Sequence, residues 1–150
     1  EKQIVPALRA GFVVLTDRYI YSLIARAQVR GVSSQWIRDV LGFALVPDVV
    51  FYLKIDIPHL IPRVINSQGF DYWESGMDLR LGNDLYDSFK KYQSLLIEEF
   101  DEMAVEFKFE VVDARKSLEE IQDELRSKIQ QLLNPEELAR PAPAVEDAQI

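Results

Sequence analysis

Three short apolar runs, separated by stretches with helical periodicity, constrain the fold of this chain more than any other feature of its sequence. The runs occupy residues 12–17 (FVVLTD), 47–56 (PDVVFYLKID) and 107–114 (FKFEVVDA). The centre of the second run, VVFYL, is continuously apolar, which is typical of a strand covered on both faces of a parallel sheet. Strands that alternate with helices predict an α/β fold built on such a sheet.

Helical patterns fill the intervals between these strands. We expect the first helix, limited or kinked by Pro6, to end at Gly11, because glycine readily adopts left-handed backbone angles. Ser117 with Glu120 forms a capping box that predicts the start of a last helix. The other helices are predicted at 19–31, 33–45, 58–66 and 84–105.

The chain length of 150 residues favours one domain, predicted at 1–133. Residues 67–83 hold three of the six glycines and predict a loop. Residues 134–150 are rich in Pro, Ala and Glu and predict a flexible tail. A parallel sheet of only three strands is unusual, so the strand count indicates that part of the sheet is missing from this sequence.

Composition excludes several classes of function. Seventeen basic against 25 acidic residues give a net charge of −8, which argues against a nucleic acid polymer as partner, since such proteins cluster Lys and Arg against phosphates. Cysteine is absent and His59 is the only histidine, so the sequence has no thiolate site and no multi-histidine metal site. No apolar run reaches the ~18 residues of a membrane span, and no signal peptide is visible. We therefore expect a cytoplasmic protein without a membrane partner.

The carboxyl ends of the predicted strands carry the residues best suited to chemistry, because ligands bind at this edge of open α/β sheets. A carboxylate at the tip of a strand suits Mg²⁺ or its water, and an adjacent guanidinium matches phosphate oxygens. The strongest candidate combines an acid, an arginine and an aromatic ring ahead of a helix, whereas the other acids are better explained as charges where a strand meets water. The candidates are Asp17-Arg18-Tyr19, Asp56, and Asp113 with Arg115.

Five arginines are candidates to converge near this edge despite the negative net charge. Two of them, Arg26 and Arg30, are four residues apart and share a helix face. A solvated cationic face is the alternative interpretation. The other three are Arg9, Arg18 and Arg63.

The loop at 67–83 also carries aromatic residues between its glycines. Phe70, Tyr72 and Trp73 favour a segment that closes over a flat ligand. The alternative is that the rings only fix the loop to the body of the domain.

Taken in order, these segments resemble thymidylate kinase, a nucleoside-monophosphate kinase of the P-loop fold. PALRAGFVVLTDRYIYS resembles the family's helix, strand and Asp-Arg-aromatic motif, and PDVVFYLKIDIPHLIPRV its next strand, acid and arginine-bearing helix. GFDYWESG resembles the end of its lid, and FEVVDARKSLEEIQDEL its last strand and helix. The resemblance covers residues 1 to about 130. The DRY motif alone is weak, but the four elements in this order and spacing are moderately specific.

The resemblance implies a parallel sheet flanked by helices of the P-loop NTPase type, with a lid at about 67–81. It implies transfer of the γ-phosphate of ATP to dTMP, giving dTDP, with Mg²⁺ as cofactor and a homodimer as the assembly. Asp17 and Arg18 would be catalytic, the first near the metal ion or its water and the second on the acceptor phosphate. Arg63 would lie on the ATP side at the base of the lid. The substrate site would further include Tyr19, Ser22, Arg26, Asp71, Trp73 and Glu74.

Two departures from the family pattern bear on activity. The phosphate-binding motif GxxxxGK[ST] does not occur, so we expect the sequence to be the C-terminal two-thirds of a kinase and to be inactive alone. The family's Ala-Tyr-Gln is replaced by Ala25-Arg26-Ala27, and two lid arginines of bacterial members are replaced by Gln68 and Tyr72. These changes leave open the acceptor base and the source of the transition-state cation, for which Arg80 and Arg26 are candidates. A non-catalytic nucleotide-binding or regulatory module, or a P-loop kinase with another acceptor, are the alternatives.

Overall fold

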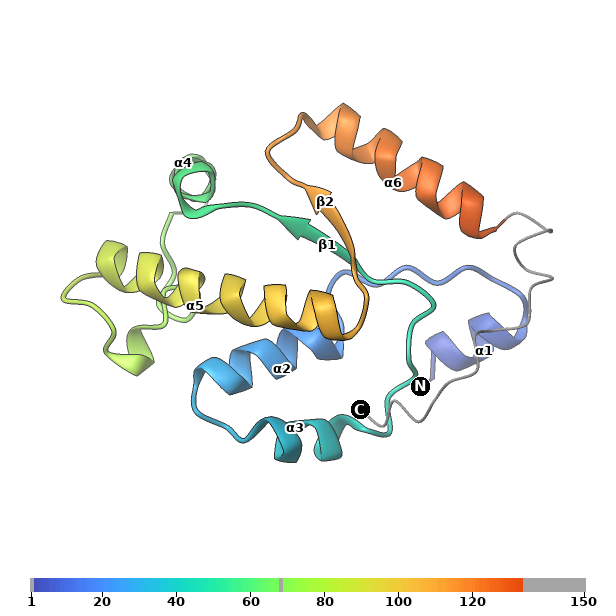
Figure 1. Cartoon of the computed structure of the whole chain (residues 1–150), viewed down its shortest axis with the longest axis horizontal. Coiled ribbons are helices and arrows are strands. Elements are labelled where there is room, and N and C mark those ends of the chain that lie inside the picture. Colours follow the sequence, from blue (N-terminus) through green and yellow to red (C-terminus); the bar gives the residue numbers. More distant parts are fainter. Residues whose placement is uncertain (1, 68, 134–150) are drawn as a thin grey trace.

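The computed structural model describes residues 2–67 and 69–133 as a mixed α/β structure (Figure 1). Its two strands pair in parallel, with Phe51 opposite Glu110 and Lys54 opposite Asp113. This pairing confirms the predicted α/β class and the parallel direction of the sheet. In chain order the elements are α1 (Ile4–Arg9), α2 (Ile20–Val29), α3 (Ser34–Leu41), β1 (Phe51–Lys54), α4 (Ile57–Asn66), the 3₁₀ turn η1 (Met77–Leu79), α5 (Leu85–Glu106), β2 (Glu110–Asp113) and α6 (Leu118–Leu132).

The main core lies between α2 and α5. Both helices direct an apolar face inward, and Ile24 of α2 and Tyr92 of α5 are completely buried. Tyr21 packs its ring against Phe109, which leads into β2, at a centroid distance of 4.9 Å. A smaller cluster of Val112, Ala114 and Ile121 joins β2 to α6, which lies on the other side of the sheet from α5 (Figure 1). A helix therefore packs on each side of the sheet, although Leu53 and Val111 stay exposed.

Local signals correctly predicted two helix starts. Ser117 Oγ accepts a hydrogen bond from the Glu120 backbone N–H, and the Glu120 carboxylate accepts one from the Ser117 N–H at 2.9 Å. Asp84 caps α5 in the same way by accepting from the Asp87 N–H at 2.8 Å. These caps satisfy backbone donors that have no partner within the first turn of a helix.

The strand predicted at 12–17 is wrong, since the structure assigns no strand there. Phe12, Val13 and Leu15 are exposed, Leu15 to 74%. The segment runs between α1 and α2 without a neighbouring strand (Figure 1). A β-strand exists only as one member of a hydrogen-bonded pair, and an apolar sequence alone does not supply the partner.

The other differences concern length and coverage. Within the runs 47–56 and 107–114, only residues 51–54 and 110–113 pair as strands, where the two segments run alongside each other. The prediction that the second run is covered on both faces is wrong at Leu53, which is exposed. The third helix ends at Leu41 rather than at residue 45, because the chain turns at Gly42. No helix in the described ranges is both long and apolar enough to cross a bilayer. The predicted tail at 134–150 lies outside the described residues.

Candidate functional site

The candidate residues meet where the segment 70–80 contacts α2. Arg26 Nη2 donates to both carboxylate oxygens of Glu74, each at 2.8 Å. The same carboxylate lies 3.9 Å from Nη1 of Arg18, which is 62% exposed. The structure thus brings together three predicted site residues, two of them arginines that share one carboxylate.

Arg18 has an unusual backbone conformation. Its φ of +65° lies in the left-handed region, which costs a residue with a side chain roughly 1–2 kcal/mol. Such strain persists where the surrounding structure enforces it, and it is concentrated at functional sites. Within the described ranges, the guanidinium of Arg18 makes no hydrogen bond. Its donors therefore face solvent and suit an anionic group.

A second ion pair repeats the contact one helical turn further along. Arg30 Nε lies 2.9 Å from Asp78 Oδ2, and Arg30 Nη2 lies 3.3 Å from Oδ1. The Arg30 guanidinium also sits over the Tyr92 ring at 5.0 Å. Side chains four residues apart share a helix face, so Arg26 and Arg30 together bind the segment 74–78.

Asp71 shapes the turn that presents Glu74. Its Oδ1 accepts hydrogen bonds from the backbone N–H groups of Trp73 at 2.8 Å and Glu74 at 3.1 Å. Helix α5 fixes the same backbone, since Gln93 donates to the Glu74 carbonyl at 2.9 Å and Ser88 Oγ donates to the Ser75 carbonyl at 2.7 Å. The carboxylate of Glu74 therefore projects from a backbone held on both sides.

One of the three aromatic residues of the loop fixes it to the domain, whereas the other two are exposed enough to contact a flat ligand. Phe70 packs on Phe89 at a centroid distance of 4.9 Å and so fixes the loop to α5. Tyr72 and Trp73 contact each other edge to face at 5.2 Å, and Trp73 is 61% exposed. The last two rings have open faces on which a planar group can stack.

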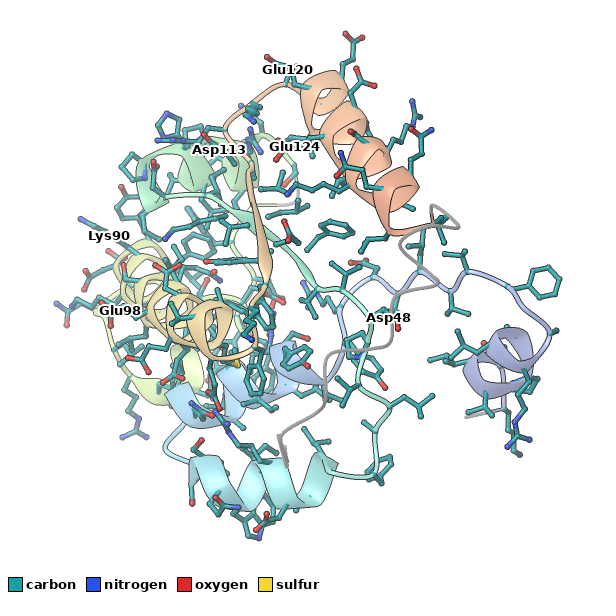
Figure 2. The ribbon with its side chains drawn as sticks, turned by 45° about the vertical axis from the view of Figure 1, so that its right-hand side comes forward. Asp48, Lys90, Glu98, Asp113, Glu120 and Glu124 are labelled. Atoms are coloured by element: carbon teal, nitrogen blue, oxygen red, sulfur yellow. The ribbon has the colours of Figure 1, made fainter. Side chains whose placement is uncertain are left out.

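The acids at the ends of β1 and β2 form a separate cluster with Arg115 and His59. Arg115 Nη2 lies 2.8 Å from Asp113 Oδ2, and Arg115 Nη1 lies 3.8 Å from Asp56 Oδ2. His59 Nδ1 is 2.6 Å from Asp56 Oδ1. Hydrogen bonds from Arg115 hold the pKa of Asp113 well below its usual range, and bonding to His59 lowers the pKa of Asp56. Figure 2 shows Asp113 at the end of β2 that leads to α6.

Several predicted site residues lie outside both clusters. In the part of the chain that the structure describes, Asp17 and Arg63 are exposed and make no ion pair. The Ser22 hydroxyl donates to the Tyr19 carbonyl at 2.8 Å, which ties both residues to the first turn of α2. No group of three potential metal ligands occurs in residues 2–67 and 69–133. Asp17 would therefore hold a metal ion only together with ligands from the substrates or from water, which is the usual arrangement for Mg²⁺.

Sequence reasoning missed Asp78 and Gln93. A signal for Asp78 was present, because Glu74 and Asp78 have the same four-residue spacing as Arg26 and Arg30. Gln93 acts through its side-chain amide on a backbone carbonyl and carries no sequence signal.

Comparison with known proteins gives one family. The family described as thymidylate kinase matches residues 1–125. A probable thymidylate kinase 2 of Saccharolobus solfataricus is 33% identical over 128 residues, covering 84% of this chain and 60% of the relative. A probable thymidylate kinase of Archaeoglobus fulgidus is 31% identical, with 89% of this chain and 61% of the relative covered. One of Methanocaldococcus jannaschii is 34% identical, with 75% and 51% covered. The chain thus spans about half to three-fifths of the length of these relatives.

Proposed function

The chain belongs to the thymidylate kinase family, and on that premise we propose that the complete protein containing it transfers the γ-phosphoryl group of ATP to dTMP, giving dTDP. The observation that carries the proposal is the family match over residues 1–125. Arg18 beside Glu74 supports it, because its exposed guanidinium offers forked donors that match phosphate oxygens.

We propose that the domain spans residues 1–133 and is part of a P-loop NTPase sheet. The exposed apolar residues Phe12, Val13 and Leu15 support this, because burying them requires a neighbouring strand that the described residues lack. In that arrangement Asp17 and Arg18, which follow the apolar segment 12–16, come to lie at the edge of the sheet where ligands bind.

Phosphoryl transfer needs positioning and charge stabilisation more than covalent chemistry, which suits the residues present. Arg18 binds the acceptor phosphate, because its exposed guanidinium offers paired N–H donors. Trp73 and its neighbour Tyr72 form the wall on which the base stacks. Tyr19 and Ser22 line the acceptor site at the start of α2.

ATP and Mg²⁺ are the donor and cofactor in this proposal. Asp17 fits a metal-binding role, since its carboxylate is exposed and no cation neutralises it in the described ranges. The ion, when bound, neutralises phosphate charge during transfer. Arg63 is assigned to the donor side on the same family grounds, at the root of a lid that extends over about 67–81.

The test is an assay of the complete protein with ATP, Mg²⁺ and a panel of nucleoside monophosphates, with the diphosphates separated by chromatography. We expect the highest kcat/KM with dTMP. Arg18→Met should lower kcat/KM by about 10- to 100-fold, because a hydrogen-bonded charged pair contributes about 1.5–3 kcal/mol. Arg38→Met serves as the matched control, since Arg38 pairs with Glu106 between α3 and α5. Turnover of none of the acceptors refutes kinase function, and preference for another monophosphate refutes the choice of dTMP.

We also propose that the protein is a cytoplasmic homodimer. Sedimentation equilibrium of the complete protein checks the assembly: a single species of twice the chain mass is expected, and a monomer at micromolar concentration contradicts it.

A further inference from the structure

Two cations compete for one carboxylate in the candidate site. Glu74 Oε1 lies 2.8 Å from Arg26 Nη2 and 3.9 Å from Arg18 Nη1. The Arg26 side chain is only 26% exposed, whereas that of Arg18 is 62% exposed. A pair that is better shielded from water interacts more strongly, so Glu74 is bound to Arg26 and only approaches Arg18.

The backbone around Glu74 is fixed by hydrogen bonds, so only its side chain is free to move. The Asp71 turn and the bond from Gln93 fix the backbone on one side, and the Arg30–Asp78 pair fixes the segment one turn further on. A rotation of the Glu74 side chain then decides which arginine it neutralises.

We propose that Arg26 is a positioning residue that occupies the Glu74 carboxylate and thereby keeps the Arg18 guanidinium available for the acceptor phosphate. The inference rests on the proposed function for its substrate. Arg18, Arg26 and Glu74 together carry one net positive charge, which attracts a phosphate. Without Arg26, Glu74 neutralises Arg18, and the incoming phosphate has to displace a carboxylate.

The kinetic test uses the complete protein and four variants: Arg26→Met, Arg26→Lys, Glu74→Gln and the double variant R26M/E74Q. We expect R26M to raise the KM for dTMP about tenfold and to change kcat by less than about threefold, because ground-state binding is what is lost. Arg26→Lys keeps the positive charge beside Glu74 and should lie closer to the wild type. In the E74Q background, R26M should cost less than threefold in KM, since no carboxylate remains to cover Arg18.

A chemical readout tests the same idea without turnover. Phenylglyoxal modifies exposed arginines, and mass spectrometry of the Arg18 peptide gives its rate of modification in nucleotide-free protein. We expect this rate to fall several-fold in R26M and to recover in R26M/E74Q. Arg38→Met is the matched control: it breaks an Arg–Glu pair elsewhere and should change neither the Arg18 rate nor the KM.

Each outcome of these experiments either supports or overturns the proposed role of Arg26. An equal KM penalty of R26M with and without Glu74 means that Arg26 contacts the acceptor itself and overturns the proposal. An unchanged Arg18 modification rate in R26M also overturns it. Failure of the wild-type protein to phosphorylate any acceptor refutes the proposed function, whereas the modification rates still show whether Arg26 controls the exposure of Arg18. If R26M fails to fold, Glu74→Gln carries the test: without the carboxylate, Arg18 should be modified at least as fast as in the wild type, and a slower rate overturns the proposal.

Discussion

Replacement of Gly76 by alanine tests how tightly the segment 74–78 is seated on α5. Gly76 has a left-handed φ of +60°, and a Cβ built on it would lie 2.5 Å from Cγ of Tyr92. Tyr92 is fully buried, and the Arg30 guanidinium lies over its ring at 5.0 Å. The ring has little room to retreat, so we expect Gly76→Ala to destabilise the protein.

The size of the effect follows from two separate costs. The left-handed backbone costs alanine roughly 1–2 kcal/mol, of which about 0.4–1 kcal/mol is offset by the reduced freedom of the unfolded chain. Overpacking against a buried ring adds about 1–3 kcal/mol. We therefore expect a total loss of about 2–4 kcal/mol in the free energy of unfolding.

Two other glycines separate these costs. Gly31 has a φ of +82° with nothing within 4 Å of its Cβ position, so Gly31→Ala should cost only the backbone part, about 1 kcal/mol. Gly82 lies outside the left-handed region, but its Cβ would lie 2.4 Å from the Ser88 nitrogen, so Gly82→Ala reports steric overlap alone.

Urea denaturation of the complete protein, followed by tryptophan fluorescence and circular dichroism, measures all three variants. The expected order places Gly76→Ala at least about 1 kcal/mol below Gly31→Ala. Equal losses in these two variants would refute the reasoning, because the contact with Tyr92 would then contribute nothing.

Three further predictions address other elements. Ser117→Ala removes the capping box of α6 and should lower the free energy of unfolding by about 1 kcal/mol in urea denaturation. Hydrogen bonds from Arg38 lower the pKa of Glu106. The ionised carboxylate therefore stabilises the fold above its unfolded pKa of about 4.3, and this stabilisation is lost as the pH falls through the lower folded pKa. Because Glu106→Gln removes this titration, the urea midpoint of the variant should fall less between pH 7 and pH 3 than that of the wild type. Trp73→Ala should change stability by less than about 0.5 kcal/mol because the ring is exposed, but raise the KM for dTMP several-fold in the kinase assay.

Local signals predicted the helices well because their causes are local. The amphipathic pattern and the Asp84 cap define α5 within one residue of the expectation, and Ser117 with Glu120 defines the start of α6. The absence of a strand at 12–17 from the structure could not be predicted in this way. These residues have the composition of a strand, but pairing depends on a neighbour that is distant in sequence or outside the described residues.

The candidate site was predictable as a set of residues but not as a set of contacts. The Asp-Arg-aromatic motif identified Arg18 and the loop motif identified Glu74, and the two residues are 56 positions apart in the sequence. Only the structure shows that Glu74 pairs with Arg26 more closely than with Arg18. It also separates Phe70, which is packed inward, from Trp73, which faces solvent, a division that residue type alone does not predict.

The acidic net charge and the proposed anionic substrate are compatible because the relevant electrostatics are local. Charges on the surface are screened over about 8 Å at physiological ionic strength, so the net charge of −8 has little influence inside the site. The ion-paired side chains Arg18, Arg26 and Glu74 carry one net positive charge among themselves. Since the Arg30–Asp78 pair is neutral by itself, it fixes the geometry without altering that charge. The positive charge that a phosphate meets at Arg18 therefore depends on whether the Glu74 side chain pairs with Arg26 or with Arg18.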